Sequence, residues 1–165
     1  MPITRTRTRT RTRTRTQPNN HTARPTQLRD TKIDVKVQLS GLWVAMLFLF
    51  AYVDIFGFYR SDIIEGALAG EVAGQGITIN QAFLAAATGY IVIPSLMVIA
   101  SLMAPAKLNR RLNISVSIFY AITIAGLCIG ETWIYYLLGS FFEVALLLTA
   151  VRIAWRWPTT DVNSL

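Results

Sequence analysis

Four long apolar segments constrain the fold of this chain more than any other feature. They cover residues 39–59, 82–103, 112–130 and 133–154. A membrane-spanning helix needs about 20 mostly apolar residues, and each segment is close to that length. Four such blocks are too many to be the buried helices of a soluble domain of 165 residues, of which 53% are hydrophobic. The sequence therefore predicts an all-α, polytopic membrane protein with four transmembrane helices.

The charged residues that flank these segments predict an orientation. Acids predominate in residues 60–81 and 131–132, whereas basic residues flank the opposite ends of the segments. The basic residues are Lys32, Lys36, Lys107, Arg110, Arg111, Arg152 and Arg156. Cytoplasmic loops are enriched in Lys and Arg, so this alternation places both termini in the cytoplasm and the protein in the plasma (inner) membrane. The two-residue turn at residues 131–132 makes the third and fourth segments an antiparallel pair. The simplest arrangement is then an up-down antiparallel bundle in which the first and fourth segments lie side by side.

The first 34 residues form a separate basic region. Residues 4–16 alternate Thr and Arg and offer no apolar face to bury, which predicts a disordered, low-complexity tail. We favour a repeat expansion without a function. The alternatives are attraction to anionic lipid headgroups, a transit peptide and non-specific nucleic-acid binding, and a nucleic-acid partner is not expected. The membrane domain then covers residues 35–157, and residues 158–165 form a short polar C-terminal tail.

Residues that support metal or nucleophilic catalysis are scarce. The chain has one histidine, His21, in the polar tail, and one cysteine, Cys128, inside the third segment. No CxxC pair and no phosphate-binding motif occurs. We therefore expect no catalytic residue, no metal site and no cofactor, and a non-enzymatic membrane protein. A membrane enzyme or a quinone-binding partner has the least support.

Two acids interrupt the apolar segments. Glu143 lies about 15 Å below Trp133 at a helical rise of 1.5 Å per residue, which is close to the middle of a bilayer. Asp54 lies nearer the outer surface. A charge at mid-bilayer costs about 3 kcal/mol, so such an acid must be protonated, find a donor or line a wet cavity. The small residues Gly139 and Ser140 leave room beside Glu143 for another helix or for water, so we expect both acids to be packed inside the bundle.

Several polar side chains are candidate hydrogen-bond partners of the two acids. They are Tyr52, Tyr90, Tyr120, Tyr136, Ser117 and Thr123. If the acids are paired with such donors, they act as structural staples between helices. If they respond to protons or cations in a transport path, the chain is a small proton- or cation-coupled transporter that acts as an oligomer. Pro94 removes a backbone hydrogen bond in mid-segment and predicts a kink, with a hinge as the alternative.

Two further patterns concern the ends of the segments. In residues 60–81, Ile63, Ala67 and Leu68 recur near helical spacing, and the glycine-containing stretch AGQG follows. This pattern predicts a short interfacial helix and then a turn. Trp43 lies near one end of the first segment, so we expect its ring at the level of the lipid headgroups.

Several motifs also follow one another in a distinctive order. The first segment contains LSGLWV and then YVDI, the basic loop contains NRRLN, and the last segment runs from YY through Glu143 to RIAWRW. With Pro94 between them, these motifs resemble an uncharacterised bacterial family of small four-span membrane proteins, a domain of unknown function. The resemblance covers about residues 35–157. It implies a four-helix integral membrane protein and implies no activity.

Overall fold

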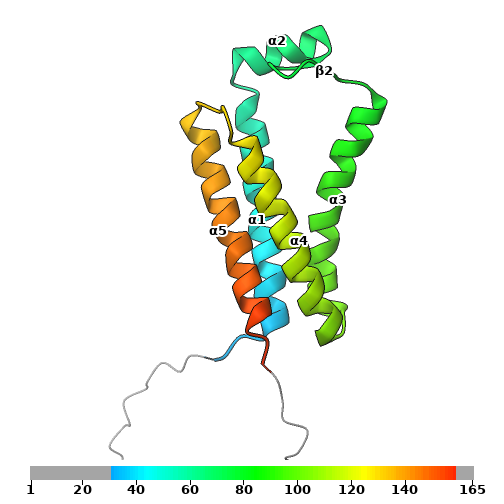
Figure 1. The fold of residues 1–165 in the computed structure, drawn as a ribbon, viewed down its shortest axis with the longest axis vertical. Coiled ribbons are helices and arrows are strands. Elements are labelled where there is room, and N and C mark those ends of the chain that lie inside the picture. Colours follow the sequence, from blue (N-terminus) through cyan, green and yellow to red (C-terminus); the bar gives the residue numbers. More distant parts are fainter. Residues whose placement is uncertain (1–30, 159–165) are drawn as a thin grey trace, which may run out of the picture. The chain divides into compact units, whose positions relative to one another are not determined.

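The computed structural model describes residues 31–158, so the predictions for the Thr-Arg repeat and for most of both tails lie outside the described residues. Four long helices run in alternating directions along this part of the chain (Figure 1). They are α1 (Val35–Gly57), α3 (Gln81–Met103), α4 (Ala106–Leu127) and α5 (Ile134–Trp155). The four predicted segments are therefore all helical, and their bounds shift by at most six residues.

The boundaries of the helices follow from local sequence. The side chain of Asp34 accepts a hydrogen bond from the backbone N–H of Lys36 and caps the start of α1 (2.8 Å). Asn80 caps α3 in the same way through the N–H of Phe83 (2.9 Å). Pro105 precedes the first residue of α4, because its fixed φ and missing N–H are compatible with a helix start and not with the interior of α3.

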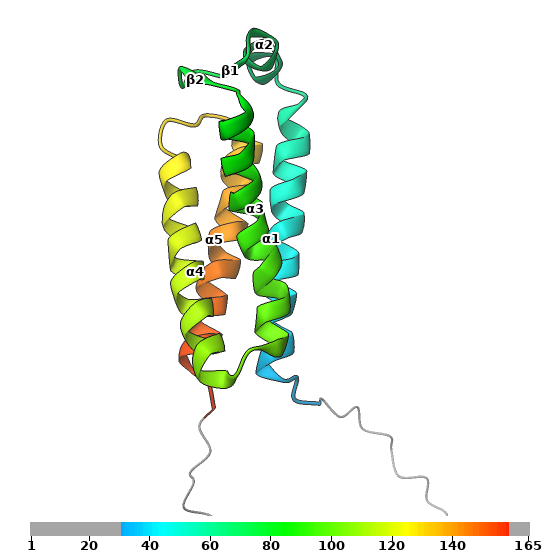
Figure 2. The ribbon, with the colours of Figure 1, turned by 90° about the vertical axis from the view of Figure 1, so that its right-hand side faces the viewer.

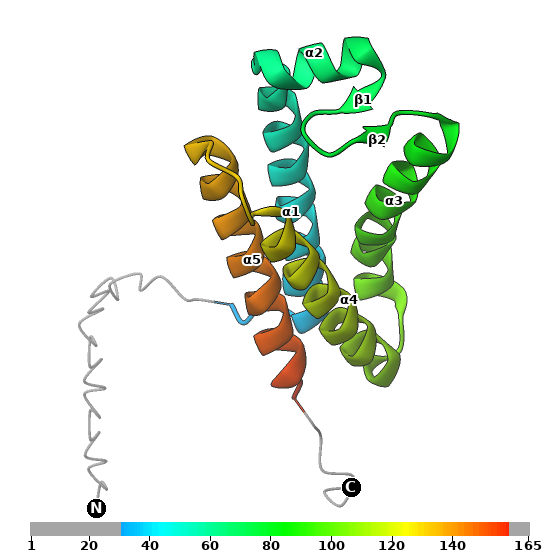
Figure 3. The same ribbon diagram turned by 45° about the horizontal axis from the view of Figure 1, so that its top comes forward.

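Helix α1 packs against both α3 and α5, and α4 packs mainly against α5. This arrangement confirms the predicted adjacency of the first and last helices. Helices α3 and α4 meet far less, and Figures 2 and 3 show their ribbons approaching at the end where Met103 leads into Ala106. The bundle is therefore closed at that end by the α3–α4 connection, while α3 stands away from α4 and α5 toward the other end.

The connection between α1 and α3 contains a helix and a β-ribbon. Helix α2 (Ser61–Ala69) confirms the predicted short helix. The strands β1 (Glu71–Val72) and β2 (Ile77–Thr78) pair antiparallel around the predicted AGQG turn, in which both glycines have positive φ. The ribbon itself was not predicted. Gly66 allows it to fold back on α2, because a Cβ at that position would lie 2.9 Å from the carbonyl oxygen of Glu71.

Three of the described helices, α1, α3 and α5, are long and apolar enough to cross a membrane. Helix α4 does not meet that measure, although the sequence predicted a span at residues 112–130. The helix starts at Ala106, six residues before the predicted segment, and its first two turns carry Lys107, Arg110 and Arg111. The fourth span therefore stays a prediction, whereas membrane association is supported by the other three helices.

The distribution of polarity is the reverse of that in a soluble domain. Large apolar side chains such as those of Phe48, Ile122 and Phe141 are more than half exposed on the outer faces of the helices. The interior holds many polar residues, which are Ser40, Ser101, Asn109, Asn113, Ser117, Ser140 and Glu143. Helices in lipid associate through small and polar side chains because lipid already solvates their apolar faces. The described bundle fits that environment.

Candidate functional site

One cavity of the bundle lies between α3 and the helices α1, α4 and α5. Its volume is about 250 Å³, and all four long helices contribute to its wall. Glu143 of α5 lies in this wall and is only 3% exposed. Its atom Oε1 has no hydrogen-bond partner among the described residues. A buried polar atom without a partner is costly, and Oε1 of Glu143 is one of two such side-chain atoms among the described residues, with Oγ of Ser117.

Asp54 of α1 lines the same cavity and also a second one of about 340 Å³. The two cavities share the lining residues Val53, Asp54, Leu127 and Tyr136, and are therefore neighbours along the bundle. The sequence predicted that both acids are packed inside the bundle. Glu143 is buried as predicted, but Asp54 is exposed, because it faces the junction of two cavities instead of a helix interface.

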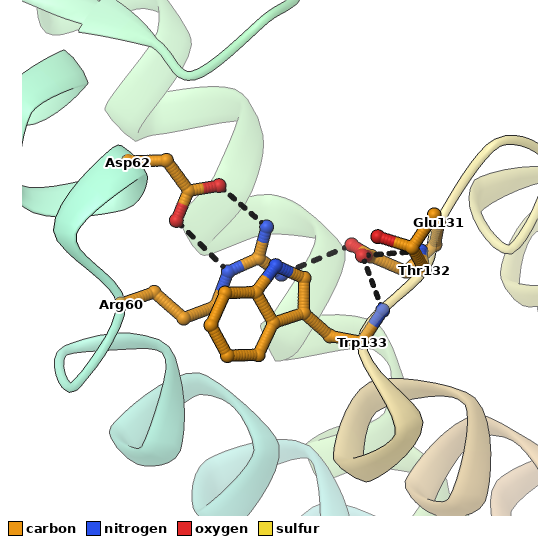
Figure 4. A network of polar contacts seen from close by, with 5 residues as sticks. All are labelled: Arg60, Asp62, Glu131, Thr132 and Trp133. Atoms are coloured by element: carbon orange, nitrogen blue, oxygen red, sulfur yellow. Dashed lines mark hydrogen bonds and ion pairs between the residues drawn. The ribbon is translucent and has the colours of Figure 1, made fainter.

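An arginine clamp lies beside the second cavity, at the end of the bundle that carries α2 (Figure 4). Arg60 donates two hydrogen bonds to Asp62, of 3.1 and 2.6 Å, and a third of 3.0 Å to Glu131. Its guanidinium also lies 4.7 Å from the ring centroid of Trp133. The clamp joins the start of α2 to the connection between α4 and α5, and its net charge is negative.

The pKa values of the two clamp acids are shifted by these contacts. The hydrogen bonds from Arg60 are the main cause that lowers the pKa of Asp62. For Glu131, partial burial raises the pKa, but the backbone N–H groups of Trp133 and Thr132 together with Arg60 outweigh it. The pKa of Glu131 is therefore lower than usual, and both acids stay ionised at neutral pH.

The six predicted hydrogen-bond partners are arranged differently from the prediction. No hydrogen bond joins any of them to Glu143 or Asp54 in the described part of the chain. Tyr90 shares a hydrogen bond with Thr123 (2.8 Å) and lines the cavity, as Tyr136 does. The remaining three are Tyr52, which is exposed, Ser117, whose Oγ is buried without a partner, and Tyr120. Two of the six, Tyr90 and Tyr136, therefore share a cavity with the acids without a hydrogen bond to them.

Tyr120 instead compensates for the proline in α3. Pro94 lies inside this helix and has no N–H to donate to the carbonyl of Tyr90, four residues earlier. The hydroxyl of Tyr120, on α4, donates to that same carbonyl oxygen. Pro94 is thus the reason that α3 offers a free acceptor to α4. Whether Pro94 also acts as a hinge stays a prediction.

A second polar cluster lies between α1, α3 and α4, and sequence reasoning missed it. The indole of Trp43 donates to Oδ1 of Asn113 (2.8 Å), and the amide of Asn113 donates to Oδ1 of Asn109 (2.6 Å). Asn109 in turn donates to the carbonyl of Ser101 (2.6 Å). Trp43 is 1% exposed, so its ring packs among the helices instead of facing outward toward lipid headgroups, and the depth of the ring in a membrane stays a prediction. We name these four residues the Trp-Asn cluster.

The predicted topology residues gather at the end of the bundle opposite the clamp. Because the helices alternate in direction, the starts of α1 and α4 and the ends of α3 and α5 share this end (Figure 1). Lys36 donates to the carbonyl of Leu102, and the guanidinium of Arg110 lies 5.8 Å from the ring centroid of Trp155. The others are Lys32, Lys107, Arg111, Arg152 and Arg156, which are exposed.

The chemistry available at the cavity is that of carboxylates, hydroxyls and aromatic rings. Within residues 31–158, no three His, Cys, Asp or Glu side chains come together as metal ligands would. Carboxylates can bind and release protons or cations.

Comparison with curated proteins and with solved structures gave no match. Comparison with protein families gave one, DUF6326, described as a family of unknown function, over residues 29–164. The matched region contains every element of the described fold and both cavities. The chain belongs to this family of unknown function, DUF6326.

Proposed function

We propose that all four long helices cross a membrane, with both termini on the cytoplasmic side. The segregation of charge supports this orientation, because the cations of Lys107, Arg110 and Arg111 lie at the end opposite Asp62 and Glu131. The lower hydropathy of α4 comes from its first two turns, which are basic and lie at that cytoplasmic end. In its remaining turns the polar side chains of Asn113 and Ser117 are buried, whereas large apolar side chains such as those of Ile118 and Ile122 are exposed.

Within this bundle, we propose that Glu143 and Asp54 form a site for a proton or a small cation. The single observation that carries the proposal is the unpartnered Oε1 of Glu143 in the wall of a cavity. A structural staple would have its oxygens satisfied by donors on a neighbouring helix, whereas the hydroxyl of Tyr90 pairs with Thr123 and that of Tyr120 with the carbonyl of Tyr90. Ionisable groups that face a cavity inside a membrane bundle are typical of ion and proton pathways.

The activity that this site fits best is that of a small, non-enzymatic transporter driven by protons or cations. The second cavity, which shares lining residues with the first, is lined by residues of α2 and the β-ribbon at the end proposed to be non-cytoplasmic. On the other side the Trp-Asn cluster fills the space between the helices. This arrangement corresponds to an outward-facing state of an alternating-access cycle.

We further propose that the lipid bilayer and a second copy of the chain are the partners of the described bundle. Helix α3 supports this part of the proposal, because α1 is the one helix against which it packs extensively and its other faces are apolar and exposed. The basic N-terminal tail is proposed to contact anionic lipid headgroups, to which each Lys or Arg near the surface contributes about 1 kcal/mol.

The test uses purified protein in proteoliposomes adsorbed to a solid-supported membrane. Concentration jumps of protons, Na⁺, K⁺ and tetraethylammonium are applied in turn, and the transient current is recorded. At least one of these cations should give a saturable current that is lost in Glu143→Gln. The matched control is Glu65→Gln, because Glu65 lies on α2 outside both cavities. Equal currents from Glu143→Gln and the unchanged protein would refute the proposed site.

A further inference from the structure

The size of the cavities restricts the class of cation. A water molecule occupies about 30 Å³ of liquid volume, and the two adjacent cavities measure about 250 and 340 Å³. We name the first, which contains Glu143, the inner cavity and the second, beside Arg60, the outer cavity. A bare proton or alkali ion would leave most of that space to water. A ligand that fills the inner cavity must be a molecule of several non-hydrogen atoms.

The residues that line the inner cavity further restrict the class of cation that it can bind. Hard metal cations such as Ca²⁺ take six to eight oxygen ligands, and alkali ions also require several. Around Glu143, the cavity offers the side-chain oxygens of Asp54 and Ser140 and two tyrosine hydroxyls, one of which is already bonded to Thr123. Most of the remaining surface is apolar. Such a wall favours contact with hydrocarbon groups. It does not offer enough oxygens to replace the hydration shell of a metal cation.

Aromatic rings in the wall of the inner cavity provide a further means of binding a positive charge. Phe50, Tyr90 and Tyr136 line the inner cavity from three different helices, and the rings of Phe50 and Tyr90 lie 6.2 Å apart in a stacked arrangement. Aromatic faces attract ammonium groups, and the attraction is strongest where water is excluded. A carboxylate with aromatic and aliphatic walls is the environment that an alkylated ammonium ion requires.

We infer that the inner cavity binds an organic ammonium ion whose nitrogen lies near Glu143 and whose apolar groups contact Phe50, Tyr90 and Tyr136. The inference rests on the proposed function and names the class of its ligand. It separates this class from inorganic cations, because only an organic ion uses both the carboxylate and the apolar walls.

The charges around the outer cavity favour the approach of a cation to the inner cavity. Glu71, Glu131 and Asp54 line it, and Arg60 is the one cation among its lining residues. The charge of Arg60 is already matched by Asp62 and Glu131 at 2.6 and 3.0 Å. The field along this route is therefore negative, and it raises the local concentration of cations while repelling anions.

The experiment measures binding by isothermal titration calorimetry on the full chain in lipid nanodiscs at constant ionic strength. Tetraethylammonium should bind saturably, and tetramethylammonium should bind several-fold more weakly because it has less apolar surface. Glu143→Gln should weaken tetraethylammonium binding at least about tenfold. Phe50→Leu should weaken it about fivefold, whereas Phe50→Trp, which retains an aromatic face, should restore it. Glu65→Gln serves as the unchanged control.

Two results would overturn the inference while leaving the proposed function in place. One is displacement of tetraethylammonium by equal concentrations of Na⁺, with Glu143-dependent Na⁺ currents. The other is equal tetraethylammonium binding by the Leu and Trp variants of Phe50. If no cation gives a response that depends on Glu143, the proposed function and the ligand class both fail.

Discussion

Replacing Tyr120 with phenylalanine is expected to destabilise the bundle by removing one hydroxyl, and the size of the effect should depend on Pro94. The hydroxyl of Tyr120 donates to the carbonyl oxygen of Tyr90, which Pro94 leaves without its usual helical donor. Tyr120 is fully buried, so no water replaces the lost donor. The two residues should therefore be energetically coupled, although they lie on different helices.

The magnitude follows from the cost of an unsatisfied buried carbonyl. That cost is about 1–3 kcal/mol in soluble proteins, whereas interhelical hydrogen bonds in membrane proteins average about 0.6 kcal/mol with a maximum of about 1.7. We expect Tyr120→Phe to lower the free energy of unfolding by about 1 kcal/mol. In a Pro94→Ala chain, the restored N–H serves the carbonyl of Tyr90, and the same substitution should cost close to nothing.

The assay is reversible unfolding in mixed micelles of a mild detergent and dodecyl sulfate, applied to the four chains of the cycle. Tyr59→Phe is the matched control, because Tyr59 is 84% exposed and its hydroxyl has no partner among the described residues. An equal cost of Tyr120→Phe in the unchanged chain and in the Pro94→Ala chain would refute the reasoning, since it would show that the hydroxyl does not replace the missing backbone donor.

Three further substitutions test other parts of the structure. Gly139→Ala should cost about 1–3 kcal/mol in the same unfolding assay, because the added methyl would overlap Cγ2 of Val53, and Val53→Ala in the same chain should recover most of the loss. Trp43→Phe should cost about 1–2 kcal/mol by removing the indole donor of the Trp-Asn cluster, and no loss would contradict that bond. Because the pKa of Glu131 is lowered in the folded protein, its contribution to stability should be full above about pH 4.3 and be lost as the pH falls through the folded pKa. Glu131→Gln should flatten this acidic part of a stability-against-pH curve, and an unchanged curve would mean that Glu131 is not held by the N–H groups of Trp133 and Thr132 and by Arg60.

The helices were largely predictable because their apolar segments are long. For α1, α3 and α5, hydropathy alone located the helix within a few residues. The start of α4 was not predictable in this way. A hydropathy window treats Lys107 and Asn109 as loop residues, whereas the backbone continues as a helix from Pro105, which fixes the start. Hydropathy indicates whether the surroundings of a segment are apolar, and it does not show where a helix starts or ends.

The candidate site was predictable in part. Glu143 was identified from sequence because an acid in the middle of an apolar segment is costly wherever that segment lies. The exposure of Asp54 depends on the divergence of α3 from α4, which no local pattern encodes. The pairing of Arg60 with Glu131 joins residues 71 positions apart. A sequence pattern alone cannot pair two charged residues that lie so far apart in the chain.

The Trp-Asn cluster had a signal that sequence reasoning overlooked. Asn109, Asn113 and Ser117 follow one another at four-residue intervals, and such spacing places polar groups on one face of a helix. Polar side chains on one face of a membrane helix generally face other helices. Because Trp43 can donate only through its indole N–H, a buried acceptor on α4 would have been its natural partner.

The central claim is that α4 crosses the membrane and completes the wall of the cavity. The most direct measurement is the labelling of single cysteines by a membrane-impermeant maleimide in intact cells, in a Cys128→Ser chain. Lys107→Cys precedes most of α4 and Thr132→Cys follows it, and both residues are exposed. We predict that Thr132→Cys reacts from outside and that Lys107→Cys reacts only after permeabilisation. Labelling of both positions from the same side would contradict the claim, since α4 would then lie on one surface of the membrane.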